Sequence, residues 1–126
     1  MPGDDDEPAP VAPELFVPDV PAAVRFYVDR LGFRLLREDS TFAIVYLGPA
    51  VVMLAHESLY GQAVRAPRGL AIDVRIMVPD VDAVRERCRQ QGVTVVHEIA
   101  DREYGLRDFI ISDPNGFRLR FASPLG

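Results

Sequence analysis

The chain has 126 residues, 48% of them hydrophobic, and this length and composition favour one globular domain. Its net charge of −5 falls to −1 (14 basic minus 15 acidic residues) without the acidic residues 4–7, so no basic surface for nucleic acid is expected. No apolar run approaches the roughly 20 residues that span a membrane, and the single cysteine, Cys88, excludes an internal disulfide.

Residues 1–11 are acidic and rich in proline, which predicts a solvated arm without secondary structure of its own. The first residues, Met1 to Glu7, lack the basic and apolar regions of a signal peptide. The cytoplasm is therefore the expected compartment.

The most informative feature is an internal repeat. Residues 17–25 return as residues 78–85 with one residue deleted, and both copies begin Val-Pro-Asp. A glycine follows each copy, Gly32 in the first and Gly92 in the second, and an alternating apolar stretch comes next. The two halves of the chain are thus expected to fold alike.

Each repeat predicts a helix with defined ends. Asp19 and Asp80 are placed to accept hydrogen bonds from the first unpaired N–H groups of a helix. Gly32 and Gly92 suit the left-handed position that terminates one. Cys88 lies on the apolar stripe of the second helix, so we expect a buried hydrophobic side chain rather than a nucleophile.

Strand patterns surround the two helices. An extended segment precedes each helix, and three strands follow it, at 33–37, 42–47 and 50–55 in the first half and at 93–99, 107–112 and 117–121 in the second. The sequence therefore predicts an α+β domain, residues 12–126, made of two tandem βαβββ modules. Module one covers 12–56, a linker covers 57–69, and module two covers 70–123.

Several strings in these modules are shared with one known superfamily. They are Phe26-Tyr27, Leu31-Gly32-Phe33, Gly105-Leu106-Arg107-Asp108-Phe109 and Asp113-Pro114-Asn115-Gly116. Together with the doubled βαβββ order, they resemble the vicinal oxygen chelate superfamily, which contains glyoxalases, bleomycin-resistance proteins and dioxygenases. The resemblance implies a curved mixed sheet with a concave pocket, helices on the convex side, and a homodimer.

In the metalloenzymes of this superfamily, the metal ligands come from the first and last strands of each module. The corresponding positions in this chain are Ala12, Met53, Asp73 and Arg120, and a shift of two residues would place Glu14 in the first position. Alanine has no donor atom, a thioether is a weak ligand, and guanidinium repels cations. We therefore predict no metal and no cofactor.

The two histidines do not change this prediction. His56 and His97 are each followed by a glutamate, but neighbouring residues on a strand point to opposite faces, so neither pair chelates by itself.

Strand alternation predicts which side chains line the pocket. Two loop aromatics beside glycines, Tyr60 and Tyr104, could close over it, and Tyr104 precedes the string that resembles the bleomycin-resistance proteins. The expected ligand-binding residues are Glu14, Phe16, Met53, Asp73, Arg75, Tyr104, Arg118 and Arg120. Two alternatives remain for the charges: Asp73 pairs internally with Arg118 or Arg120, or the arginines stay free for a carboxylate or phosphate of a ligand.

These features favour a metal-free protein that binds a small organic molecule, closest to the bleomycin-resistance-like branch and similar to antibiotic-resistance proteins that sequester a drug. The alternative is an enzyme of the same superfamily, glyoxalase-, dioxygenase- or lyase-like, with an unconventional metal shell or with Glu14 or Asp73 as an acid–base group. The sequence assigns no catalytic residue and does not identify the ligand.

Overall fold

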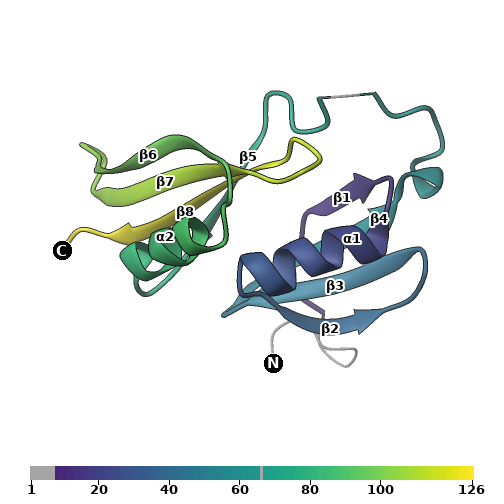
Figure 1. Cartoon of the computed structure of the whole chain (residues 1–126), viewed down its shortest axis with the longest axis horizontal. Coiled ribbons are helices and arrows are strands. Elements are labelled where there is room, and N and C mark those ends of the chain that lie inside the picture. The colour runs from purple at the N-terminus through teal and green to yellow at the C-terminus, as the bar shows by residue number, and fades with distance from the viewer. Residues whose placement is uncertain (1–7, 66) are drawn as a thin grey trace. The chain divides into compact units, whose positions relative to one another are not determined.

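The computed structural model of the protein describes residues 8–65 and 67–126 (Figure 1). The chain divides into two compact units, residues 1–68 and 69–126. Most of the predicted N-terminal arm, residues 1–7, lies outside the described residues.

The first unit contains one mixed sheet and one helix. Its strands are β1 (Glu14–Val17), β2 (Arg34–Glu38), β3 (Phe42–Leu47) and β4 (Ala50–His56), in the order β1-β4-β3-β2. Strand β1 runs parallel to β4, and the other pairs are antiparallel. Helix α1 (Val20–Arg25) connects β1 to β2, and a short 3-10 helix (Glu57–Tyr60) follows β4.

The second unit repeats this arrangement. Its strands are β5 (Asp73–Met77), β6 (Val95–Asp101), β7 (Leu106–Ser112) and β8 (Arg118–Pro124), in the order β5-β8-β7-β6, with helix α2 (Val81–Gln90) after β5. Strands β5 and β8 are parallel, as β1 and β4 are. The predicted α+β fold of tandem βαβββ modules is confirmed, and each module forms a four-stranded sheet of its own. No helix in the described part of the chain is long and apolar enough to cross a bilayer.

The helix ends follow the repeated motif. Asp19 accepts a hydrogen bond from the Ala22 N–H at 3.0 Å, and Asp80 accepts one from the Ala83 N–H at 3.1 Å. Gly32 adopts a φ of 86°, and Gly92 a φ of 66°. Both helix caps and both glycine stops are therefore as the sequence predicts, because each depends on residues close together in the chain.

One feature of the first helix was not predicted. Helix α1 continues into a π-helical turn (Phe26–Arg30), closed by a hydrogen bond from the Leu31 N–H to the Phe26 carbonyl at 3.2 Å. Tyr27 is buried there, and its ring meets the edge of Phe33 at 5.3 Å between centroids. The wider turn thus keeps large side chains on the face of the helix that packs on the sheet.

Each helix covers one face of its own sheet. Helix α1 packs on β3 and β4, and α2 packs on β7 and β8. Beneath α2, the stacked rings of Phe109 and Phe121 and the side chain of Leu119 are fully buried. Strand alternation would place Ile72 among these apolar residues, but it is 57% exposed, because β5 begins one residue after it. The opposite face of each sheet is left open by its helix.

Cys88 lies on the covered side of the second sheet and has no exposed surface. Burial raises the pKa of its thiol to about 11. At pH 8 the reactive thiolate fraction should therefore be on the order of a hundredfold below that of an ordinary cysteine. We expect a thiol-disulfide reagent to label the folded protein very slowly and the urea-unfolded protein at the normal rate. Equal rates in the two states would contradict the buried position.

Candidate ligand-binding site

The open face of the first sheet carries three of the predicted ligand-binding residues. The register between β1 and β4 places Glu14 beside Met53, and Phe16 lies two residues further along the same face. Phe16 and Met53 are half-buried, whereas Glu14 is exposed. The ring of Tyr60 lies 4.9 Å from that of Phe16 between centroids. This face therefore offers mainly aromatic and thioether surface.

The open face of the second sheet is charged. The register between β5 and β8 pairs Asp73 with Arg118 and Arg75 with Arg120. Alternation along the strands then puts these four side chains on one face, away from the helix. The predicted sorting of β5 and β8 into a charged side and an apolar side is thus seen in the strand register.

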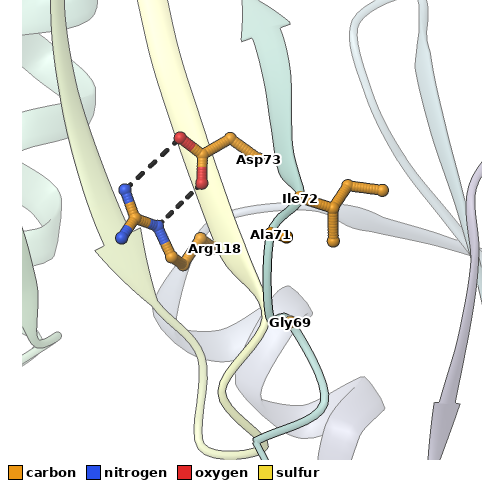
Figure 2. Close-up of a pocket in the computed structure, with 5 residues that line it drawn as sticks. All are labelled: Gly69, Ala71, Ile72, Asp73 and Arg118. Carbon is orange, nitrogen blue, oxygen red and sulfur yellow. Dashed lines mark hydrogen bonds and ion pairs between the residues drawn. The ribbon is translucent and has the colours of Figure 1, made fainter.

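Asp73 is held by two arginines. The Nε of Arg118 forms an ion pair with Oδ1 of Asp73 at 2.7 Å, but the N–H···O angle is too bent for a hydrogen bond. The NH2 group of Arg118 donates a hydrogen bond to Oδ2 of Asp73 at 3.3 Å (Figure 2). Arg120 donates to the same Oδ2 at 3.3 Å. The internal pairing considered from the sequence therefore occurs with both arginines.

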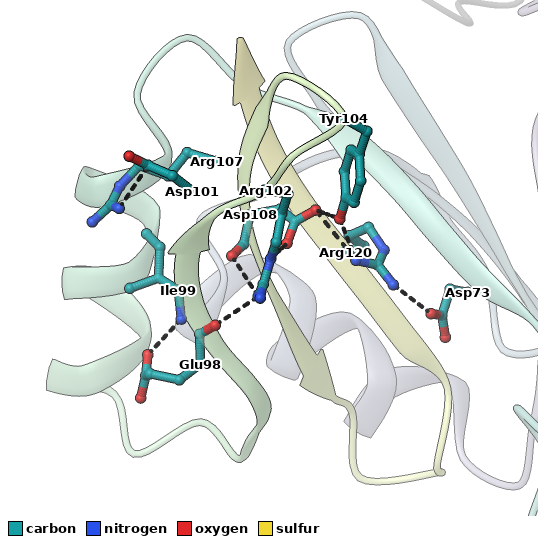
Figure 3. Close-up of polar contacts among 9 residues, drawn as sticks. All are labelled: Asp73, Glu98, Ile99, Asp101, Arg102, Tyr104, Arg107, Asp108 and Arg120. Carbon is teal, nitrogen blue, oxygen red and sulfur yellow. Dashed lines mark hydrogen bonds and ion pairs between the residues drawn. The ribbon is translucent and has the colours of Figure 1, made fainter. Parts of the chain in front are cut away.

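A buried carboxylate, Asp108 on β7, lies at the centre of a larger network (Figure 3). Arg102 donates from Nε to Oδ1 at 2.8 Å, and Arg120 donates to Oδ2 at 3.2 Å. The hydroxyl of Tyr104 donates to Oδ2 at 2.5 Å and accepts a hydrogen bond from Arg120 at 3.2 Å. Asp108 thus fixes two guanidiniums and the tyrosine that follows the β6 strand.

The electrostatics of Asp108 follow from these contacts. Burial raises the pKa of this carboxyl, but the hydrogen bonds from Tyr104, Arg102 and Arg120 outweigh it, and the pKa lies below its usual value. The hydrogen bond between Tyr104 and Asp108 raises the pKa of the Tyr104 phenol, because the phenol proton is donated to the carboxylate. The network therefore keeps a carboxylate and a neutral phenol side by side.

Two carboxylates of the second unit predict how stability depends on pH. The pKa of Asp108 is lowered, and the pKa of Glu98 is lowered to about 2 by its hydrogen bond with Arg85. A lowered folded-state pKa stabilises the fold above the unfolded value of about 4, and this contribution is lost as the pH falls through the folded value. We expect the free energy of unfolding, measured by urea titration with circular dichroism, to decrease between about pH 4 and pH 2. Unchanged or rising stability over this range would contradict the assignment.

Two open cavities adjoin these charges. The first, which we call the charged cavity, has a volume of about 530 Å³ and is lined by Asp73, Arg75, Tyr104 and Arg120. The second, of about 320 Å³, lies beside the Asp73–Arg118 pair and is lined also by Gly69, Ala71 and Ile72 (Figure 2). All five predicted ligand-binding residues of the second unit therefore line one or the other cavity, and Asp73 lines both.

Comparison with known proteins identifies the family. The sequence profile of the Glyoxalase/Bleomycin resistance protein/Dioxygenase superfamily matches residues 9–121. The chain belongs to this superfamily. No curated protein matches the sequence.

Solved structures with a similar fold agree with this membership. TioX from Micromonospora sp. ML1 is 27% identical over 91% of this chain and 98% of its own, with a TM-score of 0.76. The bleomycin-binding protein from Streptomyces verticillus, solved with copper(II)-bleomycin, is 27% identical over 88% of this chain and 92% of its own, with a TM-score of 0.67. A superfamily member from Nocardioides is 23% identical over 94% of this chain and 85% of its own, with a TM-score of 0.75, and shows the shared fold.

The residues at the superfamily's metal positions do not fit a divalent cation. Met53 lies beside Glu14 rather than Ala12, and Arg120 lies beside Arg75. The metal positions on the first strands hold either Ala12 and Asp73 or Glu14 and Arg75. In both cases the four metal positions contain a single carboxylate. Where that carboxylate is Asp73, two guanidiniums already engage it. Catalytic zinc sites of this kind use three protein ligands, so the donor chemistry is insufficient.

The histidines do not complete such a set. The Nδ1 atom of His56 accepts a hydrogen bond from the Ser58 N–H at 3.1 Å and caps the short 3-10 helix, while His97 is exposed on β6. Among residues 8–65 and 67–126, no three His, Cys, Asp or Glu side chains converge on a point that could hold a metal.

Asp108 and Arg102 are the residues that sequence reasoning missed. The string containing Asp108 was recognised only as a superfamily signature. A local signal existed, since Asp108 is the one charged residue in the run 108–111 and shares a strand face with Ile110. A carboxylate in such an apolar run indicates a buried partner.

Proposed function

We propose that this chain binds a small organic molecule and retains it without chemical conversion, as a sequestering protein of the bleomycin-resistance type. The observation that carries the proposal is the chemistry of the metal positions on the last strands of the modules. These positions hold the thioether of Met53 and the guanidinium of Arg120. The likeness to the bleomycin-binding protein at 27% identity supports it. Its ligand is not assumed to be bleomycin, because the charged cavity has more arginine than acid.

The open faces supply suitable surfaces for such a ligand. Small-molecule sites usually combine apolar lining with a few convergent polar groups. Phe16, Tyr60 and Met53 offer apolar contact in the first unit, and the charged cavity offers guanidinium and phenol groups in the second. The surface in the first unit suits an aromatic or aliphatic group, and the cavity in the second unit suits an anionic or polar group.

The alternative, an acid–base enzyme, finds less support in the geometry. Both oxygens of Asp73 are engaged by guanidiniums, which leaves this carboxylate poorly placed to take a substrate proton. Glu14 is exposed to water on its strand, which leaves it poorly sheltered for proton transfer to a bound substrate.

The test combines native mass spectrometry with elemental analysis of untagged protein purified without chelators. The proposal expects an organic molecule carried through purification, released unchanged on denaturation, and no stoichiometric transition metal. Stoichiometric metal together with metal-dependent conversion of the carried molecule would overturn it in favour of the enzyme.

The family resemblance further supports a homodimer. Light scattering during size-exclusion chromatography is expected to give a mass near twice the 14.0 kDa of the chain. A monomer mass over the micromolar range would contradict this part of the proposal.

A further inference from the structure

The arginines in and around the charged cavity outnumber the carboxylates. Arg118 pairs with Asp73, Arg102 pairs with Asp108, and Arg120 bridges both carboxylates. Arg75 makes no hydrogen bond or ion pair within its own unit, all of which the structure describes. The cluster thus has four guanidiniums and two carboxylates, an excess of two positive charges (4 − 2).

The position of Arg75 makes this excess unfavourable. Arg75 lies directly beside Arg120 across the β5–β8 pair, and like charges on neighbouring strands destabilise a sheet. The Asp73 carboxylate in the cavity does not offset this repulsion, because it is already paired with Arg118 and Arg120. An anion in the cavity would supply the missing charge.

The hydrogen-bond donors that face the charged cavity indicate which kind of anion it would bind. The hydroxyl proton of Tyr104 is donated to Asp108, and its oxygen accepts from Arg120, so the phenol offers no free proton. Arg120 donates to Tyr104, Asp108 and Asp73, so Arg75 is the cavity arginine whose whole planar fork of N–H groups remains. One guanidinium matches the two oxygens of a carboxylate, and the Asp73 carboxylate in the same lining would repel a dianionic phosphate more strongly than a monocarboxylate.

We infer that the ligand carries a carboxylate group and that Arg75 binds this group in the charged cavity through paired N–H···O hydrogen bonds. This inference rests on the proposed small-molecule binding function and specifies the chemistry of its ligand. Tyr104, exposed at the rim and held by Asp108, contacts the body of the ligand beside the carboxylate.

The experiment is a titration of ¹⁵N-labelled protein followed by NMR, including the arginine Nε–H signals. The probes are sodium benzoate, the neutral analogue benzamide, and phenyl phosphate. For the wild type, benzoate should shift the Arg75 signal saturably with a Kd on the order of 1 mM. Benzamide should produce no saturable shift, and phenyl phosphate should bind more weakly than benzoate.

Two variants with the same charge change make the test specific. Arg75→Gln should weaken benzoate binding by about tenfold or more, because the charged hydrogen bonds are lost. Arg25→Gln, at an exposed position on α1, should bind benzoate as the wild type does. Arg75 is exposed, so Arg75→Gln should fold normally and melt at or slightly above the wild-type temperature.

The outcomes separate this inference from the proposed function. Equal binding of benzoate and benzamide, or unchanged benzoate binding by Arg75→Gln, would overturn the carboxylate assignment and leave small-molecule binding intact. Tighter binding of phenyl phosphate than benzoate at Arg75 would overturn the choice of carboxylate over phosphate. Absence of any saturable shift with benzoate would overturn the inference, while native mass spectrometry decides the proposed function independently.

Discussion

Replacing Asp108 with asparagine is expected to lower the free energy of unfolding by about 2–3 kcal/mol. The carboxylate has no exposed surface and accepts hydrogen bonds from three donors with its two oxygens. Asparagine offers one acceptor oxygen and turns an N–H₂ group toward a donor. Arg102 would also lose its counter-charge, whereas Arg120 would keep Asp73. Both guanidiniums reach solvent, which places the cost near the lower end for a broken buried pair.

Urea unfolding at pH 7 measures this effect, and Asp101→Asn provides the control. Asp101 is paired with Arg107 but is largely exposed, so its replacement should change stability by less than about 0.5 kcal/mol. Asp108→Asn should also reduce the loss of stability seen on acidification, because its titrating group is removed. A stability loss from Asp108→Asn no larger than that from Asp101→Asn would show that the network does not support the fold.

Replacing Gly69 with alanine should cost about 3 kcal/mol, equivalent to a fall of roughly 10 °C in Tm. A Cβ at this position would lie 2.3 Å from the carbonyl oxygen of Gly116 and 2.8 Å from the Cα of Phe117. Both are backbone atoms of the turn before β8, so no side chain can rotate away to make room. Either the start of the second unit or the turn must move.

Gly48→Ala separates this clash from the ordinary effect of removing a glycine. Gly48 has a φ of 56° and no atom within 4 Å of an added Cβ, so its replacement should cost only about 1 kcal/mol. Thermal unfolding of the two variants measured side by side is the comparison. Equal losses would contradict the close contact between Gly69 and the turn.

Local features of the fold could be predicted from the sequence. The caps at Asp19 and Asp80 and the stops at Gly32 and Gly92 each depend on a few adjacent residues, and all four are seen. The repeat predicted the same βαβββ order in both modules, because two similar sequences were expected to fold alike. The π-helical turn after α1 could not be predicted in this way, because its residues fit an ordinary helix as well.

The polar contacts depended on the three-dimensional arrangement. Strand alternation placed Asp73 on one face with Arg118 and Arg120, but whether one or both arginines would pair with it was left open. The sequence did not indicate a role for Asp108, because Tyr104 and Arg102 reach its carboxylate only once the connection between β6 and β7 has folded. The contact of Gly69 with Gly116 likewise joins segments far apart in sequence and leaves no local signal.

The division of each sheet into a covered and an open face has a consequence for how this architecture diversifies. The residues that define the fold, such as the helix caps and the aromatic core of β7 and β8, occupy the covered face or the helix ends. Exchanges at open-face positions, such as Glu14 in one module for Arg75 in the other, leave that scaffold untouched. Duplicated modules can therefore acquire different chemical preferences separately, and new specificities can arise in this lineage with little risk to folding.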